Sequence, residues 1–317
     1  MSLRSFFILT GFLTAAVLAG RAAERGLERT FSVEPGCTLR VDTYRGSIAV
    51  VEGDAPEIRV SLQLNLGTDN AEEADRAQAA LQFEATEENN TVTLRARNPR
   101  ETGPRFVWND RQAMTLAWRI TVPRRCNVEA LTRAGAITVG SLTGRVVAQT
   151  EIGTLYLKRI DGSIDARTGQ GDVIVSRCTG PVVIRAQGGT IRTGTLGGTA
   201  DLKNINGDIE VLASHAGLSA SAEAGDVQVG FPRDLTGDAR LTTSGGSIRV
   251  TIDPAANCAI NAASGWGRVE SSLPMIIDSG ANGKSKLVGH LGQDGVSLTL
   301  RASGGHVRIA PGETYFE

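Results

Sequence analysis

The sequence predicts an all-β fold: a parallel β-solenoid, or β-helix, with about 18 residues per coil and a strand-rich cap at its N-terminal end. Glycine recurs every nine residues, apolar and polar residues alternate between the glycines, and successive nine-residue units differ. The glycines at this spacing are Gly135, Gly144, Gly153, Gly162, Gly171, Gly180, Gly189, Gly198 and Gly207. A unit this short has room for one strand and one tight corner, which glycine permits.

Each unit alternates as a half-buried strand does. The second and fourth residues after a glycine are mostly apolar, for example Ile137 and Val139, or Leu155 and Leu157. A period of two places these side chains on one face of a strand. The residue directly after glycine is often Asp, Ser or Thr, whose side chain can hydrogen-bond the backbone of a turn.

The residue two positions before each glycine alternates in type from one nine-residue unit to the next. The full repeat is therefore 18 residues long. Alternate units carry Leu142, Ile160, Cys178 and Leu196 there. The units between them carry Glu151, Gly169 and Gln187. Each coil should therefore have two unlike halves and stack on the next at about 4.8 Å, so that a continuous core forms. The general rule for parallel crossovers predicts a right-handed solenoid.

The chain divides into a signal peptide at residues 1–22, a β-rich cap at residues 23–125 and a repeat domain at residues 126–317. Arg4, the apolar run 6–19 and a small residue at Ala22 are typical of a cleaved export signal, with an uncleaved anchor as the alternative. Without that segment we expect no membrane span and an extracytoplasmic location: the periplasm, the cell surface or the medium. Within the cap, a helix is expected from Asn70 to about Leu81.

Composition excludes several classes of function. The formal net charge is −1, which gives no reason to expect a nucleic-acid partner. The four cysteines form no C-x-x-C pair, and no cofactor or metal is expected. Cys178 occupies an inward slot and should be a buried, inert thiol. Cys37, Cys126 and Cys258 each stand nine residues before a glycine, on coils expected to lie too far apart for a disulfide.

The repeated Gly-[Asp/Ser/Thr]-[Ile/Val] units resemble the bacterial putative-adhesin family of β-strand-repeat proteins, a domain of unknown function. The residues that carry the resemblance are Thr121-Val122-Pro123, Asn206-Gly207-Asp208-Ile209, Gly289-His290-Leu291-Gly292 and Ser303-Gly304-Gly305. The resemblance spans roughly residues 30–310. It implies an extracytoplasmic β-solenoid and brings no catalytic residues with it.

A column of basic residues is the candidate binding site. Gln149, Arg167, Arg185 and Lys203 stand five residues after a glycine, 18 residues apart, and should stack on one edge. Arg167, Arg185 and Lys203 could contact an acidic glycan or phosphate groups. The alternative is a solvated charge ladder that discourages edge pairing.

Acidic and histidine residues offer weaker candidates. Asp172, Asp208 and Asp226 share the slot after glycine and could bind calcium or act as acid and base, or simply form turns. His215, His290 and His306 are widely separated and are expected to be polar turn residues. Trp266, between two glycines, could stack on a sugar or pack over a corner.

These observations together predict an exported, non-catalytic cell-envelope or adhesion-type protein. It would present a solenoid face to a glycan or to an envelope protein. A polysaccharide-cleaving β-helix enzyme and a calcium-stabilised repeat protein are the alternatives.

Overall fold

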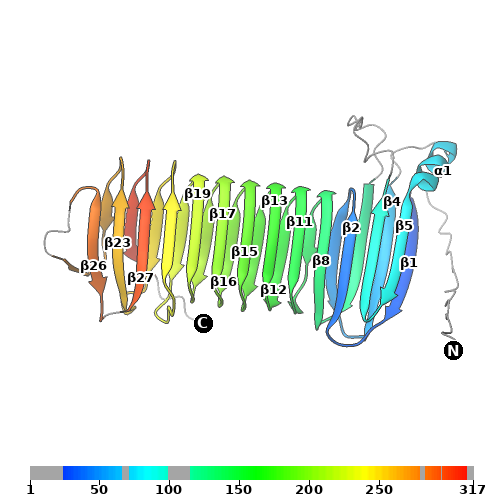
Figure 1. Cartoon of the computed structure of the whole chain (residues 1–317), viewed down its shortest axis with the longest axis horizontal. Helices are drawn as coiled ribbons and strands as arrows, with labels where there is room; N and C mark the ends of the chain where they lie inside the picture. The colour runs from blue at the N-terminus through cyan, green and yellow to red at the C-terminus, as the bar shows by residue number, and fades with distance from the viewer. Residues whose placement is uncertain (1–23, 66–70, 99–114, 279–282, 294, 313–317) are drawn as a thin grey trace, which may run out of the picture.

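The computed structural model describes residues 24–65, 71–98, 115–278, 283–293 and 295–312. The predicted signal peptide, residues 1–22, lies outside them. The described strands form two long sheets that face each other along one elongated body, as Figure 1 shows. Among the described residues, no helix is long and apolar enough to cross a membrane.

Sheets A and B each contain 14 strands. In spatial order, sheet A contains β1 (Glu24–Ser32), β4 (Glu57–Asn65), β7 (Thr115–Pro123), β3 (Ser47–Gly53), β9 (Ile137–Val139), β12 (Leu155–Asp161), β14 (Val173–Cys178), β16 (Ile191–Leu196), β18 (Ile209–Ser214), β20 (Val227–Phe231), β22 (Ile248–Ile252), β28 (Val307–Pro311) and β24 (Val269–Ser271), with β10 (Leu142–Thr143) paired to β12. Sheet B contains β25 (Ile276–Ile277), β26 (Lys286–Leu291), β23 (Cys258–Ser264), β27 (Val296–Ala302), β21 (Ala239–Thr243), β19 (Leu218–Ala224), β17 (Ala200–Asn206), β15 (Val182–Gly188), β13 (Ile164–Gln170), β11 (Val146–Ile152), β8 (Cys126–Ala134), β2 (Cys37–Thr43), β6 (Thr91–Arg97) and β5 (Gln82–Glu88).

Strand register confirms the parallel β-solenoid. In sheet B, Val146 pairs with Ile164, and Ile164 pairs with Val182, each step being 18 residues. In sheet A, Leu155 pairs with Val173 by the same offset. Each coil therefore contributes one strand to each sheet, and its two halves are the unlike nine-residue units of the sequence.

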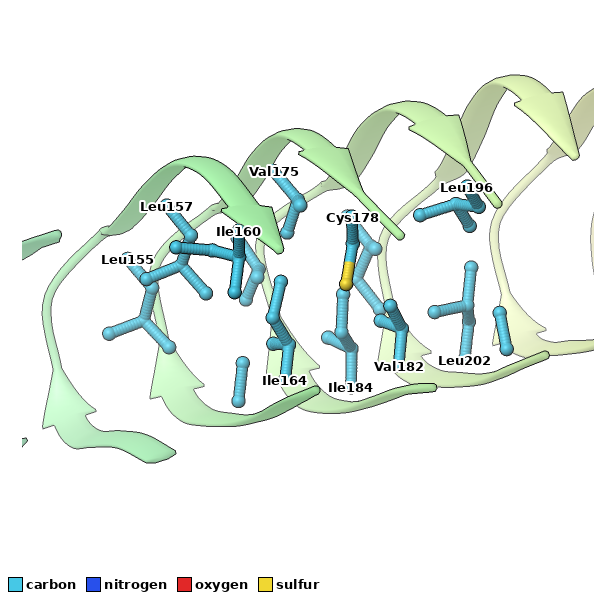
Figure 2. Close-up of a cluster of buried hydrophobic side chains, with 14 of the residues drawn as sticks. Leu155, Leu157, Ile160, Ile164, Val175, Cys178, Val182, Ile184, Leu196 and Leu202 are labelled. Carbon is cyan, nitrogen blue, oxygen red and sulfur yellow. The ribbon is translucent and has the colours of Figure 1, made fainter. Parts of the chain in front are cut away.

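The two halves differ in where their side chains turn inward. Strands of sheet B bury their first, third and fifth residues, as β15 does with Val182, Ile184 and Ala186. In sheet A, the central strands β12, β14, β16 and β18 bury the first, third and sixth, as β14 does with Val173, Val175 and Cys178. Figure 2 shows Val175 and Cys178 of β14 and Val182 and Ile184 of β15 among the side chains that fill the space between the sheets.

Glycine corners stack on one another from coil to coil. At Gly171, φ is +132°, and a Cβ would overlap the carbonyl oxygen of Gly153 in the coil before it. Where the buried fifth residue of a sheet B strand has a side-chain donor, it bonds the same corner: Thr168 donates its hydroxyl to the Gly153 carbonyl at 3.1 Å. Glycine is thus required both by the backbone angle and by the close approach of successive corners.

Both ends of the solenoid depart from the chain order. In sheet B, β2 lies between β6 and β8, and in sheet A, β3 lies between β7 and β9. The coil of β2 and β3 is therefore inserted between strands that come later in the chain. The coil of β27 and β28 lies between β21 and β22 and the coil of β23 and β24. Antiparallel strands cover both ends: β1, β4 and β5 at one, and β25 and β26 at the other.

The predicted cap, residues 23–125, thus supplies one coil of the solenoid as well as end strands. Helix α1 (Ala71–Ala80) lies in this region close to the expected span, while its expected N-cap, Asn70, is outside the described residues. Sheet B runs on without a break from β2 to β8, and sheet A from β3 to β9. The division of the chain at residue 125 stays a prediction.

The expectation that Cys37, Cys126 and Cys258 lie on distant coils is wrong for one pair. Cys37 and Cys126 are direct register partners on β2 and β8, because the first coil is inserted beside the coil that begins at residue 126. Cys258 pairs in register with Leu291 and Val296 instead. Cys178 is buried between Ile160 and Leu196, as its slot predicted.

Candidate functional site

A shallow trough of about 1050 Å³ runs along the outer face of sheet B. Its lining comes from successive coils, from Asp42 at the end of β2 to Glu223 on β19. The trough therefore follows the solenoid axis and crosses the strands, so that equivalent side chains of successive coils line it at the strand spacing of about 4.8 Å.

The predicted basic column lies in this trough. Gln149, Arg167, Arg185 and Lys203 are successive register partners on β11, β13, β15 and β17, and all four line the trough. The structure therefore brings together the candidate residues that the 18-residue spacing put in one column.

Two of the three basic side chains already have carboxylate partners. The Arg167 guanidinium contacts Asp165 of its own strand, with Nε to Oδ1 at 3.2 Å. Arg185 pairs with Asp201 of the next strand and donates to the Asp201 carbonyl oxygen at 2.8 Å. No carboxylate among the described residues pairs with Lys203. The column thus combines two positioned guanidinium groups and one ammonium group with no acidic partner in the described chain.

These ion pairs leave the arginines able to bind an anion. The side chain of Arg167 is 55% exposed and that of Arg185 is 34% exposed. Exposed pairs of this kind contribute about 0–1 kcal/mol each, and a guanidinium has five N–H donors. The acidic partners orient the guanidinium groups without using all of their donors.

Exposed apolar side chains stand beside the basic column. Leu131 is 38% exposed, Ile152 52% and Ile205 42%, and all three line the trough. Glu151 and Glu223 are also part of the lining. The surface is therefore amphipathic, with cations and aliphatic groups side by side.

Sequence reasoning missed the apolar part of this trough, although one signal was available. Glu151, Gly169 and Gln187 occupy the outward sixth position of successive sheet B strands, and Ile205 follows them in the same slot. An isoleucine in an otherwise polar, outward column is an exposed apolar residue that the fold does not require.

The aspartates after glycine act on the backbone of the next coil. The Oδ1 of Asp172 accepts the N–H of Thr190, that of Asp208 accepts the N–H of Asp226, and that of Asp226 accepts the N–H of Ser247, each at 2.8 Å. They join coils, where a turn within their own coil was expected. In the part of the chain that the structure describes, no three His, Cys, Asp or Glu residues are placed to hold a metal ion.

The three histidines do not come together. His215 Nδ1 lies 2.9 Å from Asp234 Oδ1, and His290 Nδ1 lies 3.8 Å from Asp278 Oδ1. His306 Nδ1 accepts the N–H of Arg268 at 3.1 Å. Trp266 does not pack over its corner: its side chain is 91% exposed on the connection after β23, away from the trough lining.

A comparison with known protein families identifies the family of this chain. A family model described as Toastrack DUF4097 matches residues 38–310, which includes the coils, both inserted end coils and the trough. The chain belongs to the Toastrack DUF4097 family. This match confirms the resemblance to a putative-adhesin family of unknown function that the repeated glycine units indicated.

Solved structures similar to this Toastrack chain share little sequence with it. One is a putative adhesin from Bacteroides fragilis, 13% identical, covering 91% of this chain and 99% of its own, with a TM-score of 0.37. Another is a putative lipid-binding protein from Parabacteroides distasonis, 12% identical, covering 89% and 96%, with a TM-score of 0.37. A putative adhesin from the same organism is 10% identical, covers 90% and 97%, and has a TM-score of 0.38. The names adhesin and lipid-binding protein belong to those three proteins and are not transferred to this chain.

No protein with a curated description matches this Toastrack chain in sequence.

Proposed function

We propose that this protein is an exported, non-catalytic cell-envelope or adhesion-type protein that binds an extended acidic glycan along the trough of sheet B. The observation that supports this proposal is the stacked column of Arg167, Arg185 and Lys203 inside the trough. The column offers cationic donors at a regular spacing along one line, which a linear polymer with repeated negative charges can follow.

The length of the trough supports a polymer over a small ligand. A ligand that crosses the strands from β11 to β17 meets a new outward side chain about every 4.8 Å. Each contact with an exposed cation is weak on its own, but contacts made by one chain add up because later contacts are intramolecular. Leu131, Ile152 and Ile205 add aliphatic surface on which the apolar face of a sugar ring can pack.

The proposed experiment measures retention of the purified chain on immobilised acidic polysaccharide, neutral polysaccharide and peptidoglycan. We expect retention on the acidic polymer that falls as salt rises, because exposed charges are screened. The variant with Arg167, Arg185 and Lys203 all changed to Ala should lose at least about tenfold in affinity, which corresponds to about 1.4 kcal/mol.

A matched control comes from the opposite sheet. Arg159, Arg177 and Arg192 are exposed on sheet A, and changing all three to Ala removes the same charge. This control variant should bind as the wild type does. Equal losses in both variants would reduce the effect to net charge, and no retention on any polymer would shift the proposal to a protein partner. Release of new sugar ends during incubation would favour the polysaccharide-cleaving alternative.

A further inference from the structure

Cys37 and Cys126 occupy adjacent positions that are far apart in the sequence. Cys37 begins β2, Cys126 begins β8, and the two are direct partners in the parallel register. The Gly36 N–H donates to the Arg125 carbonyl oxygen at 2.7 Å directly before the pair, which holds this register. Neighbouring strands lie about 4.8 Å apart, within the range of about 4.4–6.8 Å between Cα atoms that a disulfide spans.

Both side chains are buried in the core. Cys37 is 1% exposed and Cys126 is 0% exposed. The neighbouring Cys126 side chain lowers the pKa of Cys37. The neighbouring Cys37 side chain, together with burial, raises the pKa of Cys126, whose thiol donates to the Asn127 carbonyl oxygen at 3.3 Å. The two thiols therefore lie on adjacent strands inside the core, and Cys37 is the member of the pair that loses its proton first.

The other two cysteines have no such neighbour. Cys178 lies between Ile160 and Leu196 in its column, and Cys258 lies between Leu291 and Val296. Burial raises the pKa of both thiols. The chain thus contains one cysteine pair and two isolated, buried thiols.

We propose that Cys37 and Cys126 are a cross-linking site, at which a disulfide clamps the inserted N-terminal coil to the solenoid. The oxidant is a small or protein disulfide. The Cys37 thiolate attacks one sulfur of the oxidant and releases the other as a thiol, which gives a mixed disulfide. The Cys126 thiolate then attacks the Cys37 sulfur and releases the second thiol, so that two protons and two electrons leave the protein and reduce the oxidant.

The cross-link would join two segments that are neighbours in the solenoid but far apart in the sequence. The coil of β2 and β3 is the first solenoid coil in the sequence, yet it must enter between strands that come later. A bond between β2 and β8 closes a long loop that contains β3 to β7 and α1, and a loop of that length removes much entropy from the unfolded chain. Because both sulfurs are buried in the finished coil, the reaction belongs to the stage at which β2 docks against β8.

The first test maps the disulfide. The full chain is refolded from denaturant in a glutathione redox buffer, free thiols are alkylated under denaturing conditions, and the peptides are identified by mass spectrometry without reduction. We expect a linked Cys37–Cys126 peptide pair about 2 Da lighter than the sum of the two reduced peptides, with Cys178 and Cys258 alkylated. Four alkylated cysteines, or any other pairing, would overturn the proposal.

The second test separates the bond from the packing of the side chains. The melting temperature is measured with and without reductant for the oxidised wild type, Cys37→Ala and Cys178→Ala. Reductant should lower the melting temperature of the wild type and of Cys178→Ala by about 5 °C or more, and leave Cys37→Ala unchanged. A wild type that melts at the same temperature with and without reductant would also overturn the proposal.

Discussion

At the scale of the residue, the aspartates after the corner glycines are the connectors between coils. Asp208 accepts the backbone N–H of Asp226, and Asp226 in turn accepts the N–H of Ser247. Each carboxylate therefore satisfies a donor that a corner would otherwise leave to water. The slot that the sequence showed as a turn residue is a link along the solenoid axis.

Changing Asp208 tests this link. Asp208→Ala should lower the free energy of unfolding by about 1–2 kcal/mol, because the Asp226 N–H loses its acceptor. Asp208→Asn should cost less, since an amide oxygen still accepts. Glu223→Ala, at an exposed acidic residue on β19, is the control and should be near neutral in chemical denaturation.

A chelator should leave the melting temperature of the wild type unchanged; a drop would favour the calcium-stabilised alternative.

Cys258 makes a second residue-scale prediction, for alkaline pH. Burial raises the pKa of its thiol from 9.0 to about 11. Between these values the unfolded chain has lost this proton and the folded chain keeps it, so the free energy of unfolding falls as pH rises. The stability that the protonated, buried Cys258 thiol contributes is complete below about pH 9 and is lost by about pH 11.

The measurement compares denaturation across that window. Cys258→Val should show a decline that is shallower than the wild type's by about 1 kcal/mol per pH unit. Val250→Ala, at a buried residue without a titrating group, should keep the wild-type slope. Identical slopes in the wild type and Cys258→Val would contradict this prediction.

At the scale of the element, the last coil in the sequence is an internal coil in space. β27 has β21 on one side and β23 on the other, and β28 lies between β22 and β24. Backbone amides of a coil flanked on both sides are held in two ladders of hydrogen bonds. Position along the chain and position in the core are therefore independent at this end.

Hydrogen exchange should report this placement. The amides of β27 and β28 should exchange as slowly as those of β21 and β22, because opening them requires separating neighbours on both sides. Those of β25, at the end of sheet B, should exchange faster. Exchange of β27 and β28 at the rate of β25 would mean that the inserted coil frays as a terminal segment does.

At the scale of the whole molecule, the unit of the solenoid is the 18-residue coil. Removing residues 171–188 joins Gln170 to Gly189, the next glycine in the same slot. The deletion removes β14 and β15, so that β13 and β17 become neighbours in sheet B. Arg167 then lies beside Lys203. Since each coil contacts its neighbours alone, we expect a folded solenoid that is one coil shorter.

A nine-residue deletion is the matched control. Removing residues 171–179 would place β15 against β12 in sheet A, where the inward positions are the first, third and sixth, while β15 buries its first, third and fifth. Circular dichroism and thermal melting should show a cooperative transition for the 18-residue deletion and a strongly destabilised chain for the nine-residue one. Equal stability of the two would mean that the halves are interchangeable.

The sequence by itself determined the coil. Its length, the corner glycines, the inward slots and the column of Arg167, Arg185 and Lys203 all follow from a repeat that is local in the chain, because each coil stacks on the next one. The register partners of the structure reproduce that column directly. Even the exposed Ile205 breaks the pattern of its outward slot, so that the sequence contained this signal as well.

Tertiary structure alone decided the order of the coils at the two ends and everything that depends on it. The pairings of β2 with β8 and of β21 with β27 join segments far apart in the chain, and a periodic pattern gives the same residues the same slot whichever coil they stack on. The placement of Cys37 beside Cys126 on neighbouring strands was for that reason missed. The trough also needed the structure, because a column of side chains becomes a hollow only when the neighbouring columns and corners are placed in space.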